Sequence, residues 1–189
     1  EKKVEMNSEG DTVRIAVITD GGKVSVKSMP EVMATIDGDY LVINNQYEMV
    51  WLLFNKPTIK GVNYSKIRIG DNIDFGLLDT VPMPSMRLFD NTEIDGNGKS
   101  IKGVTIKGSS IFGDTKGLTI RNLTFTDCSV ESTATTGSAL LTGKHTGNLT
   151  VSGVVLNNCS VVAPCKVGLL TGVLCEGTHA ITDVEAVGG

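Results

Sequence analysis

The sequence predicts an all-β protein: a right-handed parallel β-helix of about 30 residues per coil, with a short N-terminal capping α-helix and a small N-terminal β element. The first observation is a gapless internal repeat. Residues 118–130 align with residues 149–161 at an offset of 31, which also relates Cys128 to Cys159. A third copy occupies residues 180–187, and we identify an earlier copy in residues 101–106. The second observation is that β-branched residues alternate with polar ones in each copy, as in stacked solenoids.

The first 30 residues have a different pattern. Residues 12–19 and 23–29 both alternate apolar and polar side chains, and the Asp20-Gly21-Gly22 sequence between them favours a tight turn. An isolated hairpin is only marginally stable. We therefore expect residues 1–30 to form a β-hairpin that packs on the solenoid or ends an upstream domain. Residues 31–189 are assigned to the β-helix.

A helix is predicted over residues 46–54. Tyr47, Val50, Trp51 and Phe54 recur at helical spacing. An Asn at position 45, followed three residues later by Glu48, is typical of a helix N-cap with a reciprocal acid. We expect this helix to cover the open end of the first coil, with Trp51 and Phe54 buried. The alternative is that its aromatic stripe binds a partner.

The remaining chain supplies the coils. Residues 66–70 and 73–75 are predicted first-coil strands, residues 77–87 an irregular excursion, and residues 95–98 a tight turn. The residues expected to stack inward are Ile101, Val104, Ile106, Ile120, Leu123, Phe125, Val151, Val154 and Leu156. Asn122, Asn157 and Asn158 are expected at turns, where side-chain amides can form ladders between coils.

The C-terminal coil, near Ala186, is followed by no amphipathic segment that could cover it. Its last ladder would be an open parallel edge. We therefore expect this coil to be open, to continue in a longer native chain, or to associate end to end with another molecule.

Composition restricts the partners. A formal charge of −4 and a pI near 5.2, with scattered Lys and Arg, argue against nucleic acid, which requires a basic patch. No apolar run is long enough to span a bilayer, so we expect no membrane insertion. The sequence begins without Met or a signal peptide, so we interpret it as a mature or trimmed form.

The four cysteines are too few and too irregularly spaced for a disulfide scaffold or a zinc site. We expect Cys128 and Cys159 to be buried free thiols on neighbouring coils, and a Cys165–Cys175 bridge is the less favoured alternative. His145 and His179, the only histidines, are expected at turns or on the surface. We therefore predict no metal site and no cofactor.

Four carboxylates are the candidate catalytic residues if the protein is an enzyme: Asp71, Asp74, Asp90 and Glu93. Polysaccharide hydrolases gather two or three acids on one face, with one protonated and one ionised. Structural roles are favoured here, since Asp95 belongs to a turn and the family resemblance described below explains the run from Asp71 to Asp74 as a strand signature. A calcium loop at residues 95–99 is disfavoured because Lys99 takes a ligand position.

From about Tyr40 onward the chain resembles the β-helix modules with GLUG-type repeats of surface and secreted proteins in gut Bacteroides-like bacteria. The landmarks, in order, are residues 47–53, 67–75, 89, 94–101, 111–113 and 117–123. Two departures are Ser110, where the family pattern has Gly, and an extra residue within residues 168–172.

This resemblance implies a cell-surface or secreted location. We expect a non-catalytic module for adhesion that binds glycans or host or surface proteins. The alternatives are a polysaccharide hydrolase or lyase of the β-helix class, and a passive structural spacer. Fold alone does not decide among them.

Overall fold

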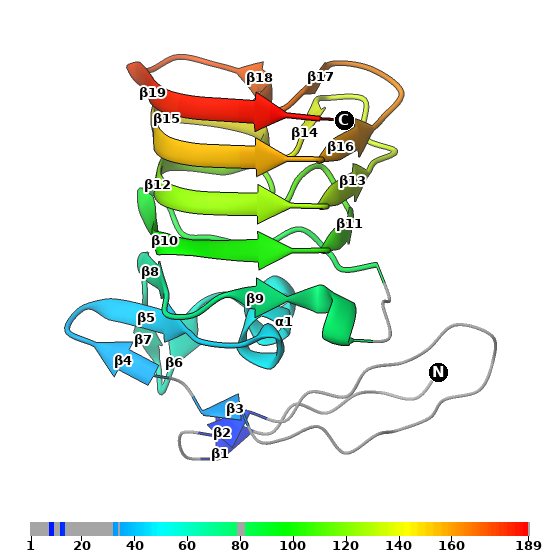
Figure 1. The fold of residues 1–189 in the computed structure, drawn as a ribbon. Helices are drawn as coiled ribbons and strands as arrows, with labels where there is room; N and C mark the ends of the chain where they lie inside the picture. Colours follow the sequence, from blue (N-terminus) through cyan, green and yellow to red (C-terminus); the bar gives the residue numbers. More distant parts are fainter. Residues whose placement is uncertain (1–7, 10–11, 14–31, 34, 79–81, 189) are drawn as a thin grey trace.

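The computed structural model describes residues 8–9, 12–13, 32–33, 35–78 and 82–188. From β5 onward the chain winds as the right-handed parallel β-helix predicted from the sequence (Figure 1). The largest sheet places parallel strands from successive coils side by side: β5 (Tyr40–Ile43), β8 (Lys66–Ile69), β10 (Thr92–Lys102), β12 (Thr115–Thr126), β15 (Thr142–Asn157), β18 (Thr171–Leu174) and β19 (His179–Val187). The short β9 (Ile73–Asp74) pairs with β10.

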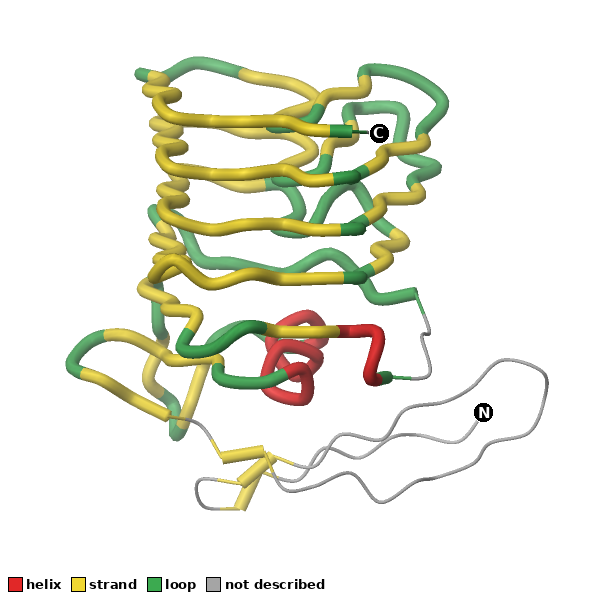
Figure 2. Tube along the Cα trace, viewed as in Figure 1, coloured by secondary structure: helices red, strands yellow, loops and turns green. Residues whose placement is uncertain are grey.

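Two smaller parallel sheets close the other sides. One contains β11 (Thr105–Lys107), β13 (Ser129–Glu131) and β16 (Ser160–Val162), and the other contains β14 (Ser138–Ala139) and β17 (Val167–Gly168). Figure 2 shows these strands stacked in ladders, with loops joining them at the corners. Because each coil repeats the same path, a residue position in one coil lies beside its equivalent in the next.

Antiparallel pairs occur near the N-terminal end. β4 (Thr35–Asp37) pairs with β5, and β6 (Thr58–Ile59) pairs with β7 (Val62–Asn63). β1 (Ser8–Glu9), β2 (Thr12–Val13) and β3 (Val32–Met33) form a small antiparallel sheet. Most of the hairpin predicted over residues 1–30 lies outside the described residues, so that assignment and the boundary at residue 31 stay predictions.

The corners are turned by residues with positive φ. Asn122, Gly153 and Asp183 occupy one corner on successive coils, with φ of 52°, 59° and 51°. Asp127, Asn158 and Gly188 occupy the next. Gly, Asn and Asp adopt this conformation at the lowest cost. The expected turn position of Asn158 is confirmed, and its Nδ2 donates to Asp127 Oδ1 at 2.6 Å. Asn122 turns its corner inside strand β12. Asn157 instead ends strand β15.

The repeat alignment is confirmed for the later coils and wrong for the earliest copy, residues 101–106. Leu118 pairs with Leu149, and Val151 with Ile181, at the predicted offsets of 31 and 30. Ile101, however, pairs with Phe125 rather than with a residue at the start of the next copy. The earlier coil is shorter, so the true counterpart of Leu118 is Thr92. All nine residues expected to point inward are nevertheless buried.

Helix α1 (Gln46–Phe54) lies at the N-terminal end of the coils, below β9 (Figure 1). Asn45 Oδ1 accepts from the backbone N–H groups of Tyr47 and Glu48, so the predicted N-cap is confirmed. The reciprocal acid bonds one residue earlier than expected: Glu48 Oε2 accepts from the N–H of Asn44 at 2.6 Å. Burial raises the pKa of Glu48, against these hydrogen bonds.

The expected burial of the two aromatic residues is half right. Trp51 is 6% exposed and belongs to the core, whereas Phe54 is 46% exposed. Met49, Val50, Leu52 and Leu53 are also buried, so the helix is enclosed on nearly every side rather than lying on one stripe. Phe54 is the last helical residue, and there the chain leaves the core.

At the opposite end, β19 pairs with β15 along one edge, and no described strand pairs with its other edge. Several large apolar residues of the last coil are exposed: Val162, Val167, Leu169, Leu174, Ile181 and Val187. This coil is therefore open within the described residues. No helix among the described residues has the length and apolar character needed to span a membrane.

Candidate functional site

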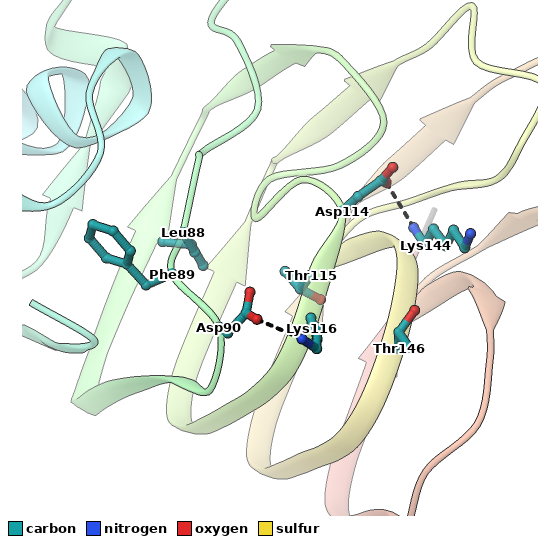
Figure 3. A pocket seen from close by; sticks show the side chains of 8 residues that line it. All are labelled: Leu88, Phe89, Asp90, Asp114, Thr115, Lys116, Lys144 and Thr146. Atoms are coloured by element: carbon teal, nitrogen blue, oxygen red, sulfur yellow. Dashed lines mark hydrogen bonds and ion pairs between the residues drawn. The ribbon is translucent and has the colours of Figure 1, made fainter.

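The candidate site is a shallow groove on the flank of the coils, with a volume of about 330 Å³. Three segments from different coils form it (Figure 3). The loop before β10 contributes Leu88, Phe89 and Asp90, and the start of β12 and the residue before it contribute Asp114, Thr115 and Lys116. β15 contributes Lys144 and Thr146, which lie beside them because Thr115 pairs with His145 and Lys116 with Thr146.

Charged groups in this groove are held by weak or local contacts. Lys116 Nζ lies 2.9 Å from Asp90 Oδ2, and both side chains are exposed. Exposed ion pairs of this kind contribute about 0–1 kcal/mol, so a ligand can displace one at little cost. Asp114 Oδ1 accepts from the backbone N–H of Lys144 at 3.0 Å and from the Ser109 hydroxyl at 3.2 Å.

Phe89 lies at the edge of the groove, and its ring is turned away from Asp90, Thr115 and Lys116 (Figure 3). The ring is half-buried, and Lys56 Nζ lies 4.6 Å from its centroid. The Leu88 side chain lies on the side of the polar residues and supplies apolar contact beside hydroxyl and charged groups (Figure 3). The groove therefore combines apolar contact with hydrogen-bonding and charged groups, which suits a hydroxyl-rich ligand.

Behind the groove lies a buried hydrogen-bond chain that sequence reasoning missed. Thr115 Oγ1 is 2.8 Å from both Thr142 Oγ1 and His145 Nδ1. His145 Nε2 lies 3.2 Å from the Gly147 carbonyl oxygen, so it donates there when Nδ1 accepts from Thr115. The expectation that His145 is a turn or surface residue is wrong, because it is completely buried in strand β15. Burial lowers its pKa, and the backbone hydrogen bonds oppose this shift.

His179 also differs from expectation. It begins strand β19 and is partly buried, and its ring packs edge-on against His145 at a centroid distance of 6.2 Å. No single-sequence pattern marks this pair, since the two histidines lie 34 residues apart and meet only through the coil stacking.

The four predicted carboxylates do not form one cluster. Asp71 Oδ1 accepts from the N–H of Asn72, and Asp74 Oδ1 accepts from the N–H of Gly76, which caps the 3₁₀ helix η1 (Phe75–Leu77). Asp90 lies in the groove, with Asp114 as the other acid there. Glu93 points elsewhere, into a charged network on the outer face of the large sheet. Three of the four therefore make local structural contacts or ion pairs away from the groove.

That network contains Glu93, Asp95, Arg68, Arg121 and Tyr40. Arg121 Nη2 lies 2.5 Å from Glu93 Oε1 and 3.1 Å from Asp95 Oδ2. Tyr40 donates its hydroxyl to Glu93 at 2.7 Å, and Arg68 stacks over the Tyr40 ring at 4.0 Å. Partial burial raises the pKa of Glu93, but the bonds from Tyr40 and Arg121 outweigh it, so the pKa is lowered. A lowered pKa suits a structural ion pair and not a general acid.

Metal ligation finds little support in the described residues. No group of three or more His, Cys, Asp or Glu side chains comes together there. In the turn considered for calcium, Asp95 accepts from the Asn97 N–H and pairs with Arg68 and Arg121, so its oxygens already face cations. All four cysteines lie in the described part of the chain as free thiols, so the Cys165–Cys175 bridge is not formed, and Cys128 and Cys159 are buried as expected.

Comparison with family models, with curated proteins and with solved structures gave no match. The interpretation of the groove therefore depends on its geometry and on the chemistry of its lining.

Proposed function

We propose that this protein is a non-catalytic binding module, placed outside the cell or on its surface, that holds glycans in the groove at Phe89. The supporting observation is the lining of that groove. Phe89 at the edge, the Thr146 hydroxyl and an exposed Asp90–Lys116 pair line a volume of about 330 Å³. Sugars present C–H faces to aromatic rings and hydroxyls to polar groups, and this lining offers both.

The order of landmarks that resembles GLUG-type modules supports a surface or secreted location and an adhesive role. Phe89 is one of those landmarks. A host or surface protein remains a partner of the same proposal, because glycans that coat such proteins would enter the same groove.

The test is a glycan array followed by titration calorimetry on any ligand found. Phe89→Ala should weaken binding by about tenfold or more, equivalent to about 1.4 kcal/mol. Thr146→Ala removes a groove hydroxyl with less effect on packing and should weaken it by a smaller factor. Phe54→Ala is the matched control, because Phe54 is an exposed phenylalanine outside the groove. Equal binding by wild type and Phe89→Ala would contradict the proposal.

The alternative is a polysaccharide hydrolase or lyase that uses Asp90 and Asp114, the two acids of the groove. Release of reducing sugar from uronate-rich polymers, abolished by Asp90→Asn, would favour it. A protein silent in both the array and the activity assay would favour the passive spacer instead.

A further inference from the structure

Two cysteines occupy the same position on neighbouring coils. Cys128 follows Asp127 and Cys159 follows Asn158, and both preceding residues turn the corner with φ of 51°. The flanking pairs Thr126–Asn157 and Ser129–Ser160 are in parallel register. Adjacent strands lie about 4.8 Å apart, which falls within the Cα separation of about 4.4–6.8 Å that disulfides require.

The two thiols lean in the same direction, toward the preceding coil. Cys159 Sγ lies 3.7 Å from the carbonyl oxygen of Phe125, which belongs to the coil of Cys128. Cys128 Sγ lies 3.5 Å from the carbonyl oxygen of Ile101, one coil further back. The Cys159 thiol is thus already directed at the coil of its partner.

The pair also differs in acidity. A hydrogen bond from the Cys128 thiol lowers the pKa of Cys159 to about 7, although burial opposes this shift. The same hydrogen bond, together with burial, raises the pKa of Cys128. Since thiolates are the attacking species in disulfide exchange, Cys159 is the nucleophile near neutral pH. It is also the more exposed of the two.

We propose that Cys128 and Cys159 are an oxidation site at which a small disulfide, such as oxidised glutathione, introduces a covalent bond between adjacent coils. The Cys159 thiolate attacks one sulfur of the oxidant, forming a mixed disulfide and releasing one thiol. Cys128 then loses its proton and attacks Cys159 Sγ, releasing the second thiol. Overall two protein thiols are oxidised to one disulfide, and one oxidant disulfide is reduced to two thiols.

The bond would close a loop of 31 residues through the middle of the solenoid. Closing a loop of this size restricts the unfolded chain, so the oxidised protein should melt roughly 5–10 °C higher than the reduced one.

The test uses the Cys165→Ser/Cys175→Ser protein, because Cys165 is exposed and Cys175 is partly exposed, so both would react independently. The folded protein is incubated with oxidised glutathione, and its intact mass is measured. We expect the loss of two hydrogen atoms without a glutathione adduct. Tryptic digestion should join the peptide of residues 122–144 to that of residues 145–166. A reductant should reverse both the mass change and the rise in melting temperature.

A further Cys128→Ala change should stop the reaction at the mixed disulfide, so that a glutathione adduct accumulates on Cys159. Peptide mapping of the oxidised wild-type protein gives an independent result if these variants fold poorly. Retention of both thiols, or glutathione adducts in place of the linked peptides, would overturn the proposal.

Discussion

Large apolar residues differ in exposure between the two ends of the solenoid. At the N-terminal end, α1 fills the opening and keeps Trp51 6% exposed. In the last coil, Ile181 occupies the position of Val151 in the preceding coil, yet Val151 is 1% exposed and Ile181 is 48% exposed. Both residues carry the same inward pattern in the sequence. Burial in a solenoid therefore depends on a neighbour on each side and not on the pattern of one repeat.

The largest expected effect concerns the covered end. Trp51→Asp places a charge in the core cluster and should cost about 3 kcal/mol or more, so that the protein unfolds or aggregates. Phe54→Asp, in the same helix but exposed, should change stability by less than about 1 kcal/mol. Thermal melting by circular dichroism measures both. A soluble Trp51→Asp protein with unchanged melting would show that α1 does not stabilise the first coil, and its aromatic residues would become a candidate partner surface.

A smaller effect should follow from pH, at the junction of β15 with the last coil. The folded-state pKa of His145 is lowered, so the neutral form is favoured by folding. The contribution of neutral His145 to the free energy of unfolding is therefore complete above the unfolded-state pKa of about 6.5. This contribution is lost as the pH falls through the folded-state pKa.

Urea unfolding at pH 7.5 and at pH 5.5 measures this contribution. The wild type should lose up to about 1.4 kcal/mol per unit of pH from this group, and His145→Gln should remove that part of the slope. The same slope in both proteins would exclude His145 as the cause.

The weakest expected effect is association through the open coil. Exposed apolar residues and an unpaired edge of β19, within the described residues, favour end-to-end contact between molecules. Sedimentation velocity at increasing concentration should show association that Ile181→Lys suppresses. Val62→Lys, at an exposed residue near the other end, is the control. A monomer at every concentration would contradict this prediction.

The sequence predicted the fold well where coils have equal length. The 31-residue offset identified β12 and β15 and their inward residues, because parallel in-register stacking places equivalent residues side by side. It misplaced Ile101, since the coil that begins with β10 has fewer residues than the later coils and pairs Ile101 with Phe125. A fixed repeat period cannot align a coil that contains a different number of residues.

The groove was harder to predict. Asp90 was a candidate residue, but Asp114 and Lys144 have no local motif. They meet Phe89 only because a loop before β10 lies beside the starts of strands from two later coils. His145 was assigned to the surface because a polar residue at a turn-rich position looks exposed, whereas Thr115 and Gly147 satisfy both ring nitrogens inside.

The most direct test of the comparison truncates the same residue at the same repeat position in two coils. Ile120 and Ile181 both align with Val151, but Ile120 has a neighbouring strand on each side. In urea unfolding, Ile120→Ala should cost about 2–5 kcal/mol, and Ile181→Ala should cost less than about 1 kcal/mol because its side chain is half exposed. Equal losses in the two proteins would contradict the account, since they would mean that the last coil is covered as fully as the middle one.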